Sequence, residues 1–352
     1  MFFLWYIFQS NNIDKKTKKE YAYILKIKYK KMSILSQFMS SSRNIKVVAI
    51  IAISILVIIP SFVMSSRYSK LYVDENASGT QDGSSEHPFK TIKQAMKEAK
   101  KNTEIHVAKG TYKENVEMKN DTEIYGEDKD DVIIEASNDD EPVVTMEDDT
   151  VINKVTLKKG SYGVKVYDKA EVSIIDCIIK DNKKDGIYIK EDSVKESRRV
   201  SISENEIKNN DMAGIYSGRR SLSIVDNDIS DNDGDGIDIE KGSNAWIADN
   251  RINGNDKSGM KLSIDGSNIW TKNNSIRKNN REGIEVSFSG VAGRIDISKS
   301  KIMENDRFGT ARVQRATVSN SSSLWSQYLT FDDNNTFSEN KFGNISSVFV
   351  IQ

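Results

Sequence analysis

The sequence is poor in the side chains that many catalytic and metal-binding sites require. Its 352 residues include one cysteine and two histidines. The single Cys177 cannot form a disulfide within the chain, and it neither supports nor excludes an oxidising compartment. With only His87 and His106, a Ser/His/Asp catalytic set is not credible, and a copper site is disfavoured because it wants clustered His, Met or Cys. No Gly-rich phosphate loop follows a strand.

The chain also lacks a cationic surplus beyond its first 70 residues. Residues 1–70 carry twelve Lys and Arg against two Asp and Glu, whereas residues 71–352 carry 39 against 50. The resulting net charge of −11 offers no cationic face to displace counterions from phosphates. The composition therefore argues against nucleic acid as a partner.

One long apolar run, VVAIIAISILVIIPSFVM, occupies residues 47–64. Eighteen uncharged residues are at the short end of what spans a bilayer. Ten Lys and Arg precede the run, so the positive-inside rule predicts a basic cytoplasmic tail over residues 1–46 and a transmembrane signal anchor over residues 47–64. The rest would lie outside a cell membrane that the chain crosses once.

A cleaved signal peptide, followed by secretion, is the alternative for this N-terminal region. Its cleavage site would be Ser65 or Ser66, which is a weak match to the usual small-residue pattern. Translation starting at Met32 or Met39 would leave an ordinary charged leader before the apolar run.

Glycines recur through the remaining sequence at a nearly constant interval. Six of them, which we call the frame glycines, stand 28, 22, 23, 24 and 26 residues apart: Gly186, Gly214, Gly236, Gly259, Gly283 and Gly309. Ile stands seven residues before each, and Asn stands four before: Asn182, Asn210, Asn232, Asn255, Asn279 and Asn305. Four have a second Asn nine residues before: Asn205, Asn227, Asn250 and Asn274. A fixed period of this size predicts a solenoid of stacked coils.

The segments after the frame glycines alternate between apolar and polar residues, as in GIYIK, GIDIE and GIEVS. Such alternation predicts short strands whose apolar side chains point inwards. No helical pattern separates these segments, so sequential strands must stack in parallel through turns. Asn suits the turns because it tolerates left-handed backbone, and stacked Asn side chains can hydrogen-bond from coil to coil.

These repeats resemble the right-handed parallel β-helix of the pectate-lyase-like superfamily. The segment LYVDENASGTQDGSSEHPFKTIKQAMKEAKKNTEIHVAKGTYKENVEM, residues 71–118, is similar to the start of many secreted β-helix proteins, including polysaccharide lyases and C5-epimerases. The resemblance covers roughly residues 71–310. It implies an all-β solenoid with a short N-terminal capping helix, preceded here by the predicted transmembrane helix. The family holds many chemistries, so the resemblance specifies the fold rather than the function.

The two ends of the solenoid need covers, because an uncovered end exposes strand edges and core. Residues 71–110 are expected to form the N-terminal cap, with Thr91 as N-cap of a helix whose apolar stripe is Ile92, Ala95, Met96 and Ala99. Residues 111–352 are expected to form the β-helix, ending in irregular coils. Four aromatic residues are expected in the core there: Trp325, Tyr328, Phe331 and Phe349.

The turn DNDGDGIDIE, residues 231–240, carries extra carboxylates. Its first six residues fit the D-x-D-x-D-G opening of a calcium loop, but Gly242 stands where that loop needs a bidentate Glu. An EF-hand is therefore not indicated. The Asn-x-x-x-Gly turn recurs in six coils and is architecture, whereas the acids need a separate explanation.

Gly163 extends the glycine series by one more step of 23 residues. The residue two positions after Gly163 and after each of the first five frame glycines should point outwards. Stacked coils lie about 4.8 Å apart and would place these residues in one row: Lys165, Tyr188, Tyr216, Asp238, Lys261 and Glu285. Such a row suits an extended polysaccharide, because Tyr rings stack on sugar rings and charged groups bond hydroxyls or carboxylates. The sequence favours polysaccharide recognition, with Tyr188, Tyr216 and Glu285 as substrate-binding residues and an acidic glycan as one candidate ligand.

The resemblance adds catalysis as an alternative. Lyases of the superfamily β-eliminate polyuronates, using a Lys or Arg base and often calcium to neutralise the sugar carboxylate. This interpretation makes Lys261 the base and Arg219 the group that binds the substrate carboxylate. Calcium would be held by Asp233, Asp235 and Asp238, since DGID at residues 235–238 resembles the Asp-Gly-x-Asp of one calcium-dependent pectate lyase family. A His-based epimerase is not indicated, because the sequence has no Asp-Pro-His-Asp motif.

Two interpretations without catalysis or glycan stay open. A solvated face rich in Lys, Glu and Asp is what solubility alone would produce, and alternating charges along Asp238, Lys261 and Glu285 would stabilise the stack modestly. A structural stalk or adhesin that displays a surface to another protein is the third functional class.

Overall fold

The computed structural model describes residues 69–192, 198–316, 318 and 322–351. The predicted tail and signal anchor, residues 1–46 and 47–64, lie outside these ranges. Within the ranges, no helix combines the length and the apolar character that crossing a bilayer requires. The described chain forms one compact unit.

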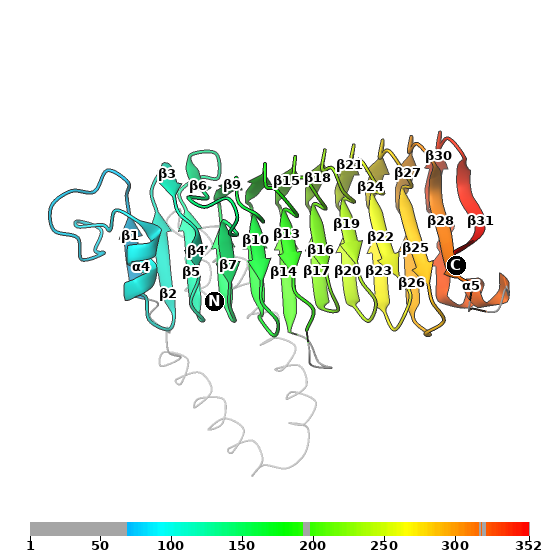
Figure 1. Ribbon diagram of the computed structural model, residues 1–352, viewed down its shortest axis with the longest axis horizontal. Helices are drawn as coiled ribbons and strands as arrows, with labels where there is room; N and C mark the ends of the chain where they lie inside the picture. Colours follow the sequence, from blue (N-terminus) through cyan, green and yellow to red (C-terminus); the bar gives the residue numbers. More distant parts are fainter. Residues whose placement is uncertain (1–68, 193–197, 317, 319–321, 352) are drawn as a thin grey trace, which may run out of the picture. The chain divides into compact units, whose positions relative to one another are not determined.

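Three long parallel sheets, named A, B and C, make up the described part of the chain (Figure 1). Sheet A has eleven strands: β1 (Ser69–Val73), β2 (Thr103–Val107), β5 (Thr122–Gly126), β8 (Thr150–Asn153), β11 (Val172–Ile175), β14 (Arg199–Ser203), β17 (Ser221–Val225), β20 (Asn244–Ala248), β23 (Asn268–Lys272), β26 (Arg294–Ser298) and β29 (Leu329–Phe331). Sheet B has ten: β3 (Gly110–Lys113), β6 (Val132–Glu135), β9 (Thr156–Lys158), β12 (Ile178–Lys180), β15 (Glu206–Lys208), β18 (Asp228–Ser230), β21 (Arg251–Asn253), β24 (Ser275–Arg277), β27 (Lys301–Met303) and β30 (Thr336–Ser338). Sheet C also has ten: β4 (Val116–Glu117), β7 (Val144–Met146), β10 (Val164–Val166), β13 (Ile187–Ile189), β16 (Ile215–Ser217), β19 (Ile237–Ile239), β22 (Met260–Ser263), β25 (Ile284–Phe288), β28 (Phe308–Arg315) and β31 (Gly343–Ile351).

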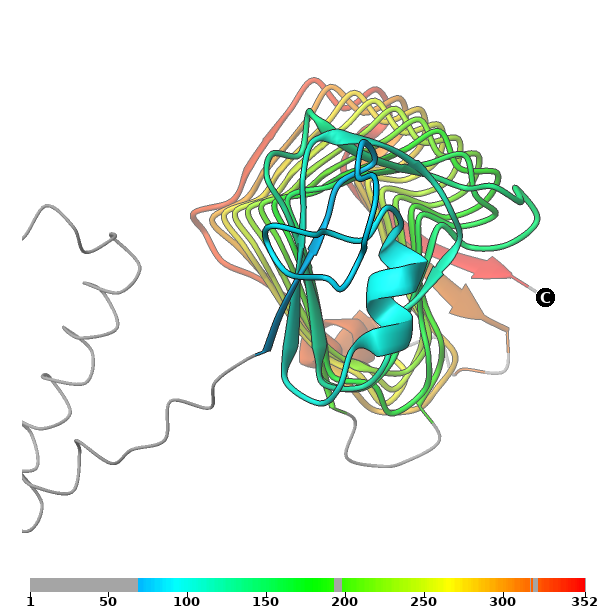
Figure 2. The same ribbon diagram turned by 90° about the vertical axis from the view of Figure 1, so that its left-hand side faces the viewer.

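Each coil contributes one strand to each sheet in turn, so the chain winds around an apolar axis (Figure 2). The strands after the frame glycines belong to sheet C, and their alternating burial confirms that the first residue after the glycine points inwards. The isoleucines seven residues before the glycines stack in register on sheet B and are fully buried: Ile179, Ile207, Ile229, Ile252, Ile276 and Ile302. The predicted parallel solenoid is confirmed.

The frame glycines allow neighbouring coils to approach closely at one corner. A Cβ atom placed on Gly236 would lie 2.6 Å from the carbonyl oxygen of Gly259, and one on Gly186 would lie 2.8 Å from that of Gly214. Real Cβ atoms do not approach a carbonyl oxygen this closely. The glycine period therefore reflects the tight backbone packing of one coil on the next.

The asparagines form two buried ladders that run along the solenoid. In the first ladder, each side-chain Nδ2 donates to the Oδ1 of the next coil at 2.9–3.0 Å, through Asn182, Asn210, Asn232, Asn255, Asn279, Asn305 and Asn340. The second links Asn205, Asn227, Asn250 and Asn274 at 2.9–3.0 Å. The predicted coil-to-coil stacking of Asn is confirmed, and it satisfies polar groups that have no access to water.

A short helix covers the N-terminal end, as predicted. Helix α4 (Ile92–Glu98) has Thr91 as N-cap in a reciprocal capping box with Gln94. Its first amides also donate to the carboxylate of Glu114 at 2.8–2.9 Å, which ties the helix to the first coils. The predicted apolar stripe of the helix is buried against the core. Figure 2 shows α4 lying across this end.

The C-terminal end differs in part from the prediction. Helix α5 (Ser322–Tyr328) carries Trp325 into the core, where its indole N–H donates to Gln314 at 2.9 Å. Tyr328 and Phe331 are partly buried against the same core. Phe349 is 42% exposed, so its predicted core position is wrong. It lies on β31, which is the edge strand of sheet C among the described residues.

Removing one rung of the first Asn ladder should destabilise the chain strongly. The Asn232 amide bonds Asn255, Ile207 O and Ser230 O, and its oxygen accepts from Asn210. Asn232→Ala leaves these buried groups without partners, so the free energy of unfolding should fall by about 1–3 kcal/mol. Urea unfolding followed by circular dichroism measures the change. The exposed Asn280, whose side chain bonds Asp256 alone among the described residues, provides the control: Asn280→Ala should change stability by less than about 0.5 kcal/mol.

Candidate functional site

The outer face of sheet C holds the predicted row of polar side chains. Strand register pairs Lys165 with Tyr188, Tyr188 with Tyr216, Tyr216 with Asp238, Asp238 with Lys261, and Lys261 with Glu285. All six are partly exposed, while the residues on either side of each within its strand are buried. The predicted geometry of the row is therefore confirmed.

The N-terminal half of the row is aromatic. The ring centroids of Tyr188 and Tyr216 lie 5.3 Å apart at an interplanar angle of 7°, and Tyr162 lies 4.9 Å from Tyr188. The Nζ of Lys184 is 5.2 Å from the Tyr162 ring. Partial burial, with the negative charge of Glu240, raises the pKa of Tyr216 to about 12, so its hydroxyl stays protonated and can donate a hydrogen bond at neutral pH.

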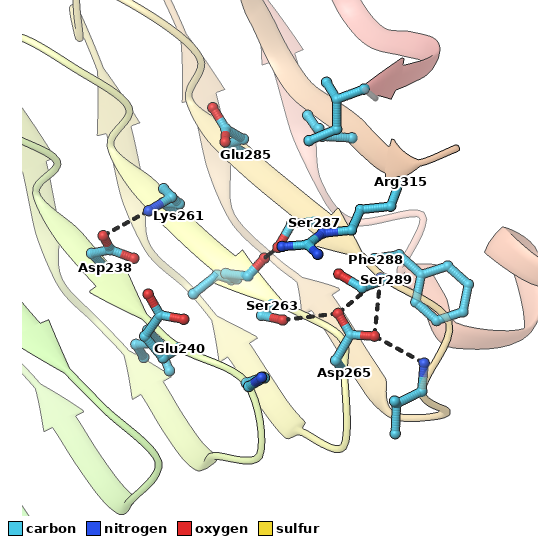
Figure 3. A pocket seen from close by; sticks show the side chains of 16 residues that line it. Asp238, Glu240, Lys261, Ser263, Asp265, Glu285, Ser287, Phe288, Ser289 and Arg315 are labelled. Carbon is cyan, nitrogen blue, oxygen red and sulfur yellow. Dashed lines mark hydrogen bonds and ion pairs between the residues drawn. The ribbon is translucent and has the colours of Figure 1, made fainter. Parts of the chain in front are cut away.

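The C-terminal half of the row opens into a cleft of about 380 Å³. Asp238, Lys261 and Glu285 line it from successive strands (Figure 3). Glu240 borders it after β19, and Arg315 reaches in from the end of β28. The cleft thus combines carboxylates with three cations, Lys241, Lys261 and Arg315.

The cleft is shaped by a buried carboxylate that orders the loop after β25. Asp265 accepts from the backbone amides of Ser289 and Val291 at 2.8–3.0 Å and from the hydroxyl of Ser263 at 3.3 Å. Its oxygens are thereby committed to the loop (Figure 3). Asp265 positions one wall and leaves ligand contacts to the neighbouring charged residues.

Lys261 and Asp238 form an ion pair at 2.8 Å. Burial by itself would lower the pKa of Lys261, but the hydrogen bond and the charge of Asp238 raise it above its ordinary value. Lys261 is therefore protonated near neutral pH. In this arrangement it offers a cation rather than the free amine that a general base requires.

The acids directly before the frame glycines have a structural role in the solenoid. Asp185 accepts from the amide of Ala213, and Asp235 from the amide of Ser258, each at 2.9 Å across neighbouring coils. Burial raises the pKa of Asp185 to about 6 and also raises the pKa of Asp235. Burial raises the pKa of Glu285 as well, against the opposing charge of Arg281.

The structure separates the three carboxylates predicted to bind calcium. Asp233 is exposed in the turn, the oxygen of Asp235 is bonded to Ser258, and Asp238 is paired with Lys261. Across the described ranges, no three His, Cys, Asp or Glu side chains are grouped so that they could hold a metal ion.

Arg219 lies apart from the cleft. Its guanidinium donates to the carbonyl oxygen of Asp192 at 2.7 Å and lies 3.4 Å from Glu191, with 43% of the side chain exposed. The adjacent Arg220 is buried and donates to the carbonyl oxygens of Tyr167, Lys190 and Ala170. Lys261 and Arg219, the two predicted catalytic residues, are therefore not brought together in one cavity.

Several cleft residues had no signal in the repeat pattern. Arg315 follows the last frame glycine, where the period breaks down, so its position could not be read from the spacing. Ser263 is the last residue of β22, and Asp265 lies two residues after it. A signal for Asp265 does exist in its local sequence, because an Asp-Gly pair after a strand marks a turn.

The dependence of the free energy of unfolding on pH should reveal the ionisation of the buried Asp185. Its folded pKa of about 6 exceeds the ordinary 3.8, so the folded chain retains a proton that the unfolded chain has lost between these values. This stabilising contribution is present below about pH 4 and is lost as pH rises through about 6. Asp185→Asn cannot ionise and keeps an oxygen for Ala213. Relative to the parent chain, its free energy of unfolding should rise across this window, by up to about 3 kcal/mol.

Glu104 serves as a control because its pKa is shifted in the opposite direction to that of Asp185. Burial would raise its pKa, but hydrogen bonds from His106 and Lys70 hold it below its ordinary value. The ionised Glu104 therefore stabilises the folded chain above its ordinary pKa, and this stabilisation is lost as pH falls. Glu104→Gln should destabilise the chain near neutral pH and have less effect in acid. Urea unfolding at several pH values between about 2 and 7 measures both variants. Equal pH profiles for Asp185→Asn and the parent chain would contradict the prediction.

Comparison with known proteins places this geometry among solenoid structures. No curated protein sequence matches the chain significantly. An alginate lyase from Paenibacillus sp. str. FPU-7 matches at a TM-score of 0.53 and 14% identity, over 72% of this chain and 96% of that one. The mannuronan C-5 epimerase AlgE4 A-module of Azotobacter vinelandii matches at 0.49 and 13% identity, over 80% and 100% of the two chains. Pectate lyase Pel9A matches at 0.48 and 13% identity, over 80% and 78%.

The family model described as "Right handed beta helix region" matches residues 162–342. The matched range contains all six frame glycines, all of both Asn ladders and all six residues of the row on sheet C. It covers more than half of the sequence, and the chain therefore belongs to the right-handed β-helix family.

Proposed function

We propose that the outer face of sheet C binds an extended polysaccharide. The observation that carries the proposal is the continuity of the row, in which stacked Tyr188 and Tyr216 lead along the solenoid into the cleft of Asp238, Lys261 and Glu285. Tyrosine rings present apolar faces to sugar rings at little cost in side-chain entropy. Carboxylates, the Lys261 ammonium and the Tyr216 hydroxyl supply hydrogen bonds to sugar hydroxyls.

The repeat of the row supports a polymer rather than a compact ligand. Successive side chains are set about 4.8 Å apart by the coil spacing, so equivalent contacts recur along the solenoid axis. The fold likeness to an alginate lyase supports a sugar polymer as the ligand class, although a shared fold is an analogy and function lies in the site. In this proposal the β-helix is held at the cell surface by the predicted anchor, residues 47–64.

Calcium-dependent cleavage of a polyuronate is the second candidate function. Lys261 lines the cleft, where a bound sugar would place its acid group within reach of the base. Arg315 lines the same cleft and provides a second cation to pair with that acid group. A base role requires that Lys261 lose its proton, and the ion pair with Asp238 opposes that loss. Neutralisation of Asp238 by a bound cation would remove the opposition. Calcium at Asp233, Asp235 and Asp238, completed by sugar carboxylates, stays a prediction.

A stalk or adhesin that displays this surface to another protein is the third candidate. A stalk or adhesin would not require an aromatic row that leads into a cleft. Glycan binding uses both features, which is why it is the favoured proposal. Binding of purified glycans to the intact chain, or its absence, separates these two classes.

Replacing the two stacked tyrosines should weaken polysaccharide binding by about tenfold or more. Thr145 occupies the same register position as Lys165, so Thr is compatible with the row. Tyr188→Thr with Tyr216→Thr removes the stacking faces and keeps the strands. A glycan array identifies the polymer, and calorimetry measures the affinity of each variant. Tyr167→Thr, at the residue directly after β10 and outside the row, is the matched control. Unchanged affinity in the double variant would contradict the proposal.

The lyase alternative predicts an unsaturated sugar end that absorbs ultraviolet light when polygalacturonate or alginate is incubated with the chain. Product formation should require calcium, and Lys261→Ala should abolish it because the base is lost. Lys165→Ala removes a lysine from the same row outside the cleft and should leave the rate unchanged. If no such product forms with any polyuronate tested, in the presence or absence of calcium, the binding proposal stands without catalysis.

A further inference from the structure

A second exposed aromatic surface lies on sheet A, away from the row on sheet C. Trp246 on β20 and Trp270 on β23 are paired directly in register on adjacent coils. They are 42% and 43% exposed, and the residues on either side of each are buried. Figure 1 shows β20 and β23 side by side. The two indoles therefore form one outward-facing platform.

The solenoid does not need indoles at this position. The three preceding coils place Ser173, Ser201 and Ser223 at the same register position. A serine there completes the sheet as well as a tryptophan does, because the side chain points away from the core. Two adjacent large apolar side chains exposed to water, where the same sheet accepts serine, mark a contact surface.

The charge around the platform differs from that of the chain as a whole. The Nζ of Lys272 lies 5.9 Å from the Trp246 ring, and no carboxylate of the described residues forms an ion pair with it. Arg294 and Asp296 at the neighbouring coil pair with each other at 2.7 Å and cancel. Within β20, β23 and β26, Lys272 is thus the one charged side chain outside an ion pair, while the carboxylate of Asp249, directly after β20, accepts from the side chain of Asn273.

Hydrogen-bonding groups border the indoles on the other side. Asn244 and Asn268 are exposed at the first position of β20 and β23, and their side chains bond each other at 3.2 Å. This bond uses one donor and one acceptor and leaves the remaining amide groups for a ligand. Flat aromatic faces, amides and a cation are thereby arranged over two adjacent coils.

We propose that the Trp246–Trp270 platform is a second polysaccharide-binding surface, selective for an acidic sugar chain such as a polyuronate. The indoles stack on the apolar faces of consecutive sugar rings, Asn244 and Asn268 bond hydroxyls, and Lys272 pairs with a sugar carboxylate. The coil spacing of about 4.8 Å is similar in length to one unit of an extended sugar chain, so the chain would run along the solenoid axis. This surface is independent of the proposed function of sheet C.

The test titrates the full chain with polygalacturonate and with its fully methyl-esterified form, which has the same sugars without the charge. Calorimetry gives the affinity, and tryptophan fluorescence reports the platform. Trp246→Ser with Trp270→Ser is the informative variant, because serine already occupies this register position in three coils. Thermal unfolding checks that the variant is folded.

The proposal expects polygalacturonate to shift the tryptophan emission of the parent chain, and the double variant to lose that shift. Its affinity for polygalacturonate should fall about tenfold or more. Tyr188→Thr with Tyr216→Thr should retain the emission shift, which separates this surface from the row on sheet C. Lys272→Gln should reduce the preference for the acidic polymer over the ester.

Three results would overturn the proposal. The first is unchanged affinity and emission in the tryptophan double variant. The second is equal affinity of the parent chain for polygalacturonate and its ester, which would remove the acidic selectivity. The third is a change in sedimentation behaviour of the double variant without any change in polymer binding, which would identify the platform as a protein contact.

Discussion

The hydrogen bonds between buried asparagine side chains of successive coils are the interaction on which the rest of the structure depends. Each amide bonds the next coil through its side chain and through the backbone, as Asn232 does with Asn210 and Asn255. A slip of one residue in any coil would break several of these bonds at once and would turn buried isoleucines outwards. The ladders thereby hold every strand at one register, and the outward rows exist because that register is kept.

The two outward surfaces use this common register for different chemistry. On sheet C, aromatic rings give way along the axis to a cleft where carboxylates outnumber cations and where Asp238 keeps Lys261 charged. On sheet A, two indoles lie beside a lysine that has no ion-pair partner among the described residues. The difference arises from a few outward positions, because the inward residues of both sheets are similar aliphatic side chains. The two proposed binding surfaces are therefore set by outward residues, whereas the register that aligns them is set by the buried asparagines.

The period of the glycines and asparagines predicted most of the fold and the geometry of the row, because each repeat reports the same local environment several times. Tyr188, Asp238 and Lys261 could be aligned from spacing alone. The spacing could not predict what depends on the irregular end of the chain, such as Arg315 entering the cleft from β28 or Phe349 lying exposed on an edge strand. It also could not show that Asp235 is engaged by Ser258, since the partner of a carboxylate depends on three-dimensional position.

The close approach of Gly236 to the carbonyl oxygen of Gly259, repeated at the other frame glycines, leaves no room for the distance between coils to vary. The distance between successive coils is consequently set by backbone contact rather than by side chains. A ligand that contacts several coils needs a repeat length that matches the spacing between them. A polymer with a different repeat length would lose equivalent contacts after a few units. If the outer faces bind a polymer as proposed, the backbone spacing would therefore favour polymers whose repeating unit matches the distance between coils.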